Sequence, residues 1–247
     1  MASNAPGQCC IEGVKHEGAT KGSMIKVRGF DAYIVAPTGS IVHKNTAILY
    51  LPDYYSIYTN AQLIADQFAA NGYYTIVPDV FCGDDFGKTP KGPDFALVPW
   101  LQSKHAPKDV EPVVDAALQH LAEEGYTKIG SVGYCFGAKY TIRYLAKGRG
   151  VSVGYVAHPS FVDEDELRAI TGPLSITAAE TDEIFPSEKR QKSEKILREI
   201  KVPFQINLYS GVSHGFSVRP DLSVRIEKFS KEAAFFQAVQ WFNEYLV

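Results

Sequence analysis

Lys128-Ile129-Gly130-Ser131-Val132-Gly133-Tyr134-Cys135-Phe136-Gly137 is the stretch that decides the fold of this 247-residue chain. Its first half predicts a short buried strand, and residues 138–146 after it have helical character. The Gly-x-Cys-x-Gly pattern between them is that of a nucleophile elbow, a sharp turn from strand to helix, with cysteine in place of the usual serine. We expect glycine at 133 and 137 because a Cβ there would collide with the adjacent strand and helix.

The position of Cys135 favours a reactive thiol. The amino terminus of a helix is positively polarised, which stabilises a thiolate and lowers the pKa of a cysteine. The pentapeptide alone leaves two interpretations open, a catalytic nucleophile or a small buried cysteine at a turn. Partners elsewhere in the chain are needed to decide between them.

Asp182 and His214 follow Cys135 in the order nucleophile, acid, histidine, which resembles the triads of α/β-hydrolases. Residues 174–178 predict a strand that leads into the polar loop with Asp182, and residues 204–209 predict another that ends shortly before His214. Open α/β sheets place their chemistry beyond the carboxyl ends of the strands, so we predict that the three side chains converge there. Glu180 and Glu183 are the rivals for the acid role.

The rest of the chain alternates predicted strands with predicted helices, which indicates an α/β fold with a mainly parallel, doubly wound sheet. Further strands are expected at 31–37, 47–51, 74–77 and 153–157. Helices are expected from 59 or 60 (each a possible cap) to 70, at 109–124, 165–170, 187–199 and 223–245. In the last helix Phe229, Phe236 and Trp241 are expected to face inward in part. The irregular stretch 81–106 predicts a pocket-lining excursion or a short cover.

Length and charge favour one soluble enzyme domain over residues 1–247, with an amino-terminal arm (1–24) packed on it. The net charge of −3 and the pI near 6.1 give no basic footprint, so neither a nucleic acid nor an anionic membrane is expected as partner. We expect a small-molecule substrate and a monomer or homodimer. No apolar run reaches the roughly 18 to 20 residues of a membrane span, and the first eight residues lack a secretory pattern, which predicts a cytoplasmic protein.

The cysteines and histidines show no local pattern of a disulfide framework or of a metal site. Four cysteines are too few for such a framework in a chain of this length, and the six histidines lack ligand spacing, so no metal is expected. The adjacent pair Cys9-Cys10 has two interpretations. It is either a redox or modification site or, as we favour, part of the packing of the arm onto the body.

Three motifs together resemble the dienelactone hydrolase (carboxymethylenebutenolidase-like) family, in its eukaryotic, fungal-looking branch. They are the pentapeptide 133–137, the run Asp182-Glu-Ile-Phe-Pro186, and the run His214-Gly-Phe-Ser-Val-Arg219. The resemblance covers about residues 9–247. It implies an α/β-hydrolase fold with a minimal cap or none, a Cys-Asp-His triad that opens lactones or cleaves esters, and no cofactor.

The resemblance also implies an acidic residue that partners the resting thiol, and Asp53 stands where bacterial members carry glutamate. Two features depart from the bacterial pattern. Bacterial members hold a substrate carboxylate with arginines, one of them from the stretch equivalent to 81–106, which here contains lysines and no arginine. Arg219 sits one position later than the arginine that follows their triad histidine. Dienelactone itself therefore need not be the substrate.

The predicted mechanism begins with His214, oriented by Asp182, taking the thiol proton. Cys135 attacks an ester or lactone carbonyl, and water hydrolyses the resulting thioester. Backbone N–H groups of Phe136 and Tyr54 are expected to hold the oxyanion, and Asp53 is expected to tune the thiol. The candidate pocket residues are Tyr55, Phe81, Phe86, Trp100, His158, Phe216 and Arg219.

Two functions of other classes stay open at this point. In the first, the scaffold is a lyase, cyclase or isomerase for a polyketide-like molecule, and His214 and an acid shuttle protons. In the second, the protein is a non-turnover ligand or redox sensor whose reporters are Cys135 and the Cys9-Cys10 pair. Hydrolysis through Cys135 requires that its sulfur meet a cavity.

Overall fold

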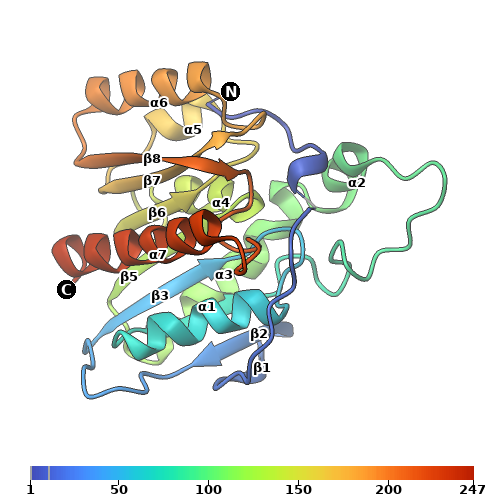
Figure 1. The fold of residues 1–247 in the computed structure, drawn as a ribbon. Coiled ribbons are helices and arrows are strands. Elements are labelled where there is room, and N and C mark those ends of the chain that lie inside the picture. Colours follow the sequence, from blue (N-terminus) through green and yellow to red (C-terminus); the bar gives the residue numbers. More distant parts are fainter. Residues whose placement is uncertain (1, 11) are drawn as a thin grey trace.

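One eight-stranded sheet runs through the centre of the computed structural model, which describes residues 2–10 and 12–247 (Figure 1). The strand order is β1-β2-β4-β3-β5-β6-β7-β8. The β1/β2 and β2/β4 pairs are antiparallel, and all the other neighbours are parallel. The strands are β1 (Ser23–Val27), β2 (Phe30–Val35), β3 (Thr46–Leu51), β4 (Tyr74–Pro78), β5 (Lys128–Tyr134), β6 (Val153–Ala157), β7 (Leu174–Thr181) and β8 (Phe204–Ser213).

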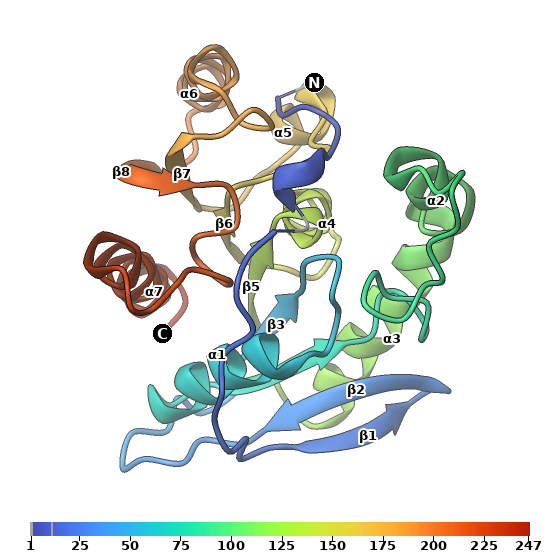
Figure 2. The same cartoon turned by 45° about the vertical axis from the view of Figure 1, so that its right-hand side comes forward.

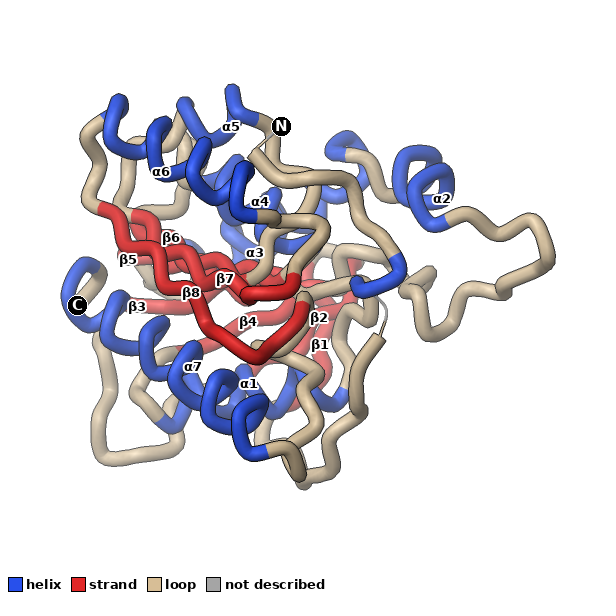
Figure 3. The backbone as a smooth tube through the Cα atoms, turned by 45° about the horizontal axis from the view of Figure 1, so that its top comes forward, coloured by secondary structure: helices blue, strands red, loops and turns tan. Residues whose placement is uncertain are grey.

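Helices cover both faces of the sheet. Helices α1 and α7 lie on one face and α3, α4, α5 and α6 on the other, as Figures 2 and 3 show. The helical segments are η1 (Gln8–Cys10), α1 (Thr59–Ala70), α2 (Leu97–Lys104), α3 (Pro107–Glu123), α4 (Phe136–Tyr144), α5 (Glu164–Arg168), α6 (Ser187–Ile200) and α7 (Arg225–Tyr245). The predicted α/β class with a mainly parallel, doubly wound sheet is confirmed.

Alternating side chains of the central strands form the two halves of the core. In β3 every residue is buried. Ile48 and Tyr50 belong to the cluster under α1 and α7, whereas Leu49 and Leu51 belong to the cluster on the α3 and α4 side. This is the period of two expected for a strand that is covered on both faces. The buried strands hold the loops at their carboxyl ends in fixed positions.

Besides the short helix η1, two elements were missed by the sequence analysis. Strand β1 precedes the predicted first strand and forms a hairpin with β2 around Gly29, whose φ is 94°. Three of its five residues are exposed, so it has no apolar alternation to detect. Helix α2 lies inside the stretch 81–106 that was expected to be irregular. Together with the loop before it, α2 projects from one side of the molecule, at the right of Figure 1.

Two details of the predicted helices are wrong. Helix α1 starts at Thr59 with Tyr58 as its cap, and no side chain caps it. Phe229 and Phe236 of α7 are 60% and 59% exposed, whereas Trp241 is buried as expected. The face of α7 that packs on the sheet carries Ala234, Ala238 and Phe242 instead, so the two phenylalanines, one heptad apart, fall on the outer face.

The amino-terminal arm crosses the edge of the sheet where the parallel strands end (Figure 2). The N–H groups of Ala2 and Ser3 both donate to the Val162 carbonyl, and farther along Val14 N–H donates to the Arg219 carbonyl. Ala2 and Ser3 are buried. The last residues of the predicted arm already belong to the sheet, because β1 begins at Ser23. Of the helices in the described part of the chain, none has the length and apolar character needed to cross a membrane.

Candidate active site

Cys135 occupies the turn between β5 and α4 with a strained backbone, φ 51° and ψ −107°. The close packing around this turn explains why positions 133 and 137 are glycines. A Cβ on Gly137 would lie 2.0 Å from the Leu51 carbonyl oxygen, and one on Gly133 would lie 2.5 Å from the Thr141 hydroxyl. The turn therefore fits against α4 and the end of β3 only without side chains at these positions. This is the geometry expected of a nucleophile elbow.

Asp182 directly follows β7 and His214 directly follows β8, so the structure brings both to the end of β5 where Cys135 lies. His214 Nε2 is 3.2 Å from the Cys135 sulfur, and its Nδ1 is 2.9 Å from Asp182 Oδ2 and 3.0 Å from Oδ1. Asp182 Oδ1 also accepts hydrogen bonds from the N–H groups of Ile184 and Phe185. The carboxylate is thus fixed, and it in turn fixes the ring of His214.

The two rival acids point elsewhere. Glu180 accepts hydrogen bonds from Ser210 and from the Gly211 N–H at an exposed position, and Glu183 is exposed as well. The side chains of Asp182 and His214, by contrast, have no exposed surface.

The sulfur and the imidazole form a buried ion pair. Burial raises the pKa of the Cys135 thiol, but a hydrogen bond from Cys10 and the charge of His214 outweigh it and hold this pKa well below the usual value. Burial lowers the pKa of His214, but the Cys135 charge and the hydrogen bond to Asp182 raise it to about 10. Both shifts favour the thiolate form of Cys135 and the imidazolium form of His214.

The amino-terminal arm covers Cys135. Cys10, in the short helix η1, is fully buried, and its sulfur lies 3.4 Å from His214 Nε2. Cys135 is fully buried as well. Cys135 has no exposed surface in this arrangement and does not line the cavity next to the elbow, so the described residues do not show the expected opening at the sulfur. The favoured interpretation of Cys9-Cys10, packing of the arm onto the body, agrees with the burial of Cys10. It did not anticipate the contact with His214, since residues 10 and 214 share no local pattern.

Asp53 lies close to the thiol but pairs with Arg219. The two form a buried ion pair, and the carboxylate also accepts hydrogen bonds from Tyr58 Oη and the Tyr55 N–H. Burial raises the pKa of Asp53 and the charge of Arg219 opposes that rise. Arg219 also donates to the carbonyls of Cys10 and Glu12. Arg219 thus ties the arm to Asp53, and a role of Asp53 in tuning the thiol stays a prediction.

The expected oxyanion donors lie beside the elbow. Tyr54 follows β3, and its ring packs on that of Phe136 with 5.4 Å between centroids. In the described part of the chain, no hydrogen-bond acceptor is found for the backbone N–H of Tyr54 or of Phe136. Both donors are therefore free to serve an oxyanion near the sulfur.

His158 and Ser160, which follow β6, also lie near the Cys135 sulfur. His158, with a positive φ of 39°, is fully buried, and its ring centroid is 4.8 Å from that of His214. The ring of His158 also interacts with the Cys135 thiol as a hydrogen-bond partner, and burial lowers the pKa of His158 to about 4, which favours the neutral ring. Ser160, which the sequence analysis did not single out, lies 3.7 Å from the sulfur through its hydroxyl and 3.2 Å from Tyr54 Oη.

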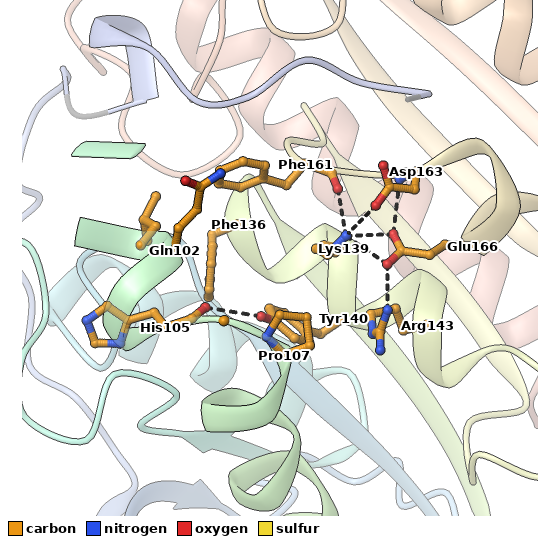
Figure 4. Close-up of a pocket in the computed structure, with 12 residues that line it drawn as sticks. Gln102, His105, Pro107, Phe136, Lys139, Tyr140, Arg143, Phe161, Asp163 and Glu166 are labelled. Carbon is orange, nitrogen blue, oxygen red and sulfur yellow. Dashed lines mark hydrogen bonds and ion pairs between the residues drawn. The ribbon is translucent and has the colours of Figure 1, made fainter. Parts of the chain in front are cut away.

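The remaining predicted pocket residues form aromatic packing around the site. Phe81 stacks on Trp100 and contacts Phe136, Phe86 packs edge-on against Tyr55, and Phe216 packs against His158. None of the predicted pocket residues lines the cavity next to the elbow, which has a volume of about 310 Å³ (Figure 4). Its wall holds Phe136 and Phe161, and its charged end holds Lys139, which is bonded to Glu166 and Asp163.

One group of side chains in the site could hold a metal ion. The ligand atoms of Cys9, Cys10 and His214 all lie within 4.8 Å of one another. The expectation that no metal site exists came from local spacing, which cannot detect ligands from opposite ends of the chain.

Comparison with known proteins identifies the family of this chain. A model of the dienelactone hydrolase family matches residues 30–246. Hydrolase pyvD of Aspergillus violaceofuscus is 47% identical over 248 residues, 100% of this chain and 99% of that protein. Hydrolase tropI of Talaromyces stipitatus is 44% identical over 255 residues, again 100% of this chain and 99% of that protein.

A solved structure, a putative dienelactone hydrolase from Klebsiella pneumoniae, has the same fold. Its TM-score to this chain is 0.73 at 16% identity, over 92% of this chain and 100% of that one. The predicted α/β-hydrolase fold and the predicted family resemblance are confirmed. The chain therefore belongs to the dienelactone hydrolase family and is an ester or lactone hydrolase.

Proposed function

We propose that this protein hydrolyses a small ester or lactone through a Cys135-His214-Asp182 triad and a thioester intermediate. The observation that carries the proposal is the chain of contacts from sulfur to imidazole to carboxylate, at 3.2 Å and 2.9 Å. The nearby cavity of about 310 Å³ has the size of a small-molecule site.

In the first half of the reaction the Cys135 thiolate attacks the carbonyl carbon. The developing oxyanion accepts hydrogen bonds from the N–H groups of Phe136 and Tyr54, and one such donor contributes about 3 to 4 kcal/mol to the transition state. His214 then gives its Nε2 proton to the departing alkoxide. With a lactone, the ring opens and the new alcohol stays on the same molecule as the thioester.

In the second half the neutral imidazole of His214 takes a proton from water, and the resulting hydroxide attacks the thioester. The carboxylic acid leaves, and the thiolate and imidazolium are restored. Asp182 holds the ring in the same orientation throughout, by accepting the Nδ1 hydrogen bond. The neutral ring of His158 lies beside the Cys135 sulfur and affects the pKa of its thiol, so it is placed to donate a hydrogen bond to a substrate carbonyl bound there.

Turnover requires the arm to move. Cys10 and η1 stand over the sulfur, and a carbonyl can reach Cys135 only when that segment is displaced. We infer that the described arrangement is a closed state of the enzyme, and that residues 2–10 open to admit substrate.

Quenched-reaction mass spectrometry over a panel of lactones and simple aryl esters tests the proposal. We expect an added acyl mass on Cys135 and loss of hydrolysis in Cys135→Ala, with Cys82→Ala, at an exposed thiol, as the matched control. Hydrolysis that survives Cys135→Ala but is lost in His214→Ala would instead support the proton-shuttle function. Tight ligand binding without turnover of any ester or lactone would support the sensor.

A further inference from the structure

Three ligand atoms of kinds that bind soft metals converge over the catalytic sulfur. Cys9 and Cys10 come from η1 and His214 from the end of β8, and their ligand atoms lie within 4.8 Å of one another. Thiolates and imidazole together favour ions such as Zn²⁺ and Cu⁺ over Mg²⁺ or Ca²⁺. The cluster is shielded from water, because Cys10 and the His214 side chain are buried and Cys9 is half-buried.

The spacing of these atoms fits a tetrahedral ion. With bonds of about 2.3 Å to sulfur and about 2.0 to 2.1 Å to nitrogen, the sulfur-to-nitrogen edge of a tetrahedron is roughly 3.6 Å. The Cys10 sulfur is 3.4 Å from His214 Nε2, and the Cys135 sulfur is 3.2 Å from the same nitrogen. Both distances to Nε2 are therefore within a few tenths of an ångström of the tetrahedral edge. The Cys135 sulfur lies outside the group of three, so it has to move toward the ion to become the fourth ligand.

The surroundings of His214 are also those of a metal ligand. Its Nδ1 donates to the buried carboxylate of Asp182, which leaves Nε2 pointing at the sulfurs. A carboxylate that orients a histidine in this way fixes the tautomer and raises the basicity of the ligating nitrogen at zinc sites. Arg219 donates a hydrogen bond to the Cys10 carbonyl and so holds this part of the arm beside His214.

We propose that Cys9, Cys10 and His214, with Cys135 as the fourth ligand, form a site for a thiophilic ion such as Zn²⁺, and that the bound ion locks the arm over the catalytic thiol. On binding, the protonated thiols and the imidazolium release their protons to solvent, and the freed lone pairs on sulfur and Nε2 form the bonds to the ion. The same nitrogen and sulfur then no longer serve hydrolysis. The bound ion therefore inhibits hydrolysis reversibly. This inhibition rests on the proposed function, but the binding of the ion does not depend on it.

Titration of the full-length, reduced protein with Cd²⁺ reports binding directly, because thiolate-to-cadmium charge transfer gives an ultraviolet band. We expect a band that saturates at one equivalent and that Zn²⁺ displaces. In Cys9→Ser/Cys10→Ser we expect an affinity at least about tenfold lower, because two ligands are lost. The exposed Cys82 supplies the matched control, since Cys82→Ser should titrate like the wild type.

A band of equal affinity in Cys9→Ser/Cys10→Ser, or no band in the wild type, would overturn the metal site. Circular dichroism of each variant establishes that it is folded before titration. Aryl-ester hydrolysis supplies a second readout: Zn²⁺ should inhibit the wild type, EDTA should reverse the inhibition, and the residual activity of the double variant should no longer respond to Zn²⁺. If no ester is hydrolysed at all, the proposed function fails while the Cd²⁺ band still decides the metal site.

Discussion

At the residue scale, the contact between Cys135 and His214 sets their charges against the effect of burial. Cys135 and His214 are enclosed together, and each makes the charged form of the other more stable than burial alone would allow. Cys82 lies at the surface and has no such partner in the described part of the chain. Partial desolvation of its thiol, together with nearby acids, raises its pKa. The reactive thiol of the chain is therefore expected at position 135 and not at 82.

The pH dependence of hydrolysis follows from this ion pair. Thiolate is present above the lowered pKa of Cys135, and imidazolium is present below the pKa of His214, which is about 10. We expect kcat/KM to stay level from about pH 7 to about pH 9 and to fall near pH 10. A neutral histidine base with the ordinary pKa of about 6.5 would instead give a rate that rises through that value. A pH profile with a simple aryl ester distinguishes the two.

Asp182 should be far more important for catalysis than its acidic neighbours. In Asp182→Asn the ring of His214 loses its anionic partner, and we expect kcat to fall by about 10³- to 10⁴-fold. Glu180→Gln is the control, because Glu180 bonds to Ser210 and Gly211 at the surface, and it should change kcat by less than about threefold. Steady-state kinetics of both variants measures the difference, and equal losses would show that the acid is misassigned.

At the scale of elements, the elbow depends on how closely β3, β5 and α4 approach one another. The β3 and β5 strands are direct neighbours, and Gly137 at the start of α4 lies against the carbonyl oxygens of Leu51 and Pro52. The same approach brings the loop with Tyr54 beside Phe136, where the oxyanion is expected. Stability and catalysis therefore share one packing contact.

Gly137→Ala should break that contact. The new Cβ would lie 2.0 Å from a backbone oxygen, so strand and helix must separate, and we expect a loss of about 3 kcal/mol or more in the free energy of unfolding. Gly92→Ala is the control, since a Cβ there meets nothing within 4 Å, and it should change the stability by less than about 0.5 kcal/mol. Urea denaturation measures both. A wild-type midpoint for Gly137→Ala would contradict the close approach.

At the scale of the whole molecule, the arm joins parts of the sheet that are far apart in sequence. Its first residues bind the loop after β6, Cys10 contacts His214, and Arg219 binds its middle. Ala2 is anchored in an apolar pocket that includes Ile142, Val162 and Phe185. The closed site is thus stabilised by contacts remote from the sulfur itself.

Releasing that anchor should expose the catalytic thiol. In Ala2→Asp an unpaired carboxylate is placed in the apolar pocket, which favours the detached arm. We expect iodoacetamide to alkylate Cys135 at least about tenfold faster than in the wild type, as followed by mass spectrometry. Ala19→Asp, at an exposed position of the same arm, should leave the rate unchanged. Equal rates in all three proteins would show that the arm does not control access.

The sequence by itself predicted the α/β fold and the family, which are confirmed, and it predicted an elbow at Cys135 with Asp182 and His214 as partners, whose catalytic roles stay a prediction. These are local signals: glycine spacing, the alternation of strands and helices, and polar residues just after predicted strands. Strand β1 was not predicted because its mostly exposed side chains do not alternate between apolar and polar. Phe229 and Phe236 were wrongly predicted to face inward because apolar residues occur on more than one face of α7.

Only the tertiary structure decided that Cys10 lies on His214, that Arg219 pairs with Asp53, and that the thiol is covered. The residues of these contacts are 204 and 166 positions apart along the chain. No period or spacing relates residues at such distances, because their meeting depends on how the finished sheet positions its loops and on which path the arm takes across the strand ends.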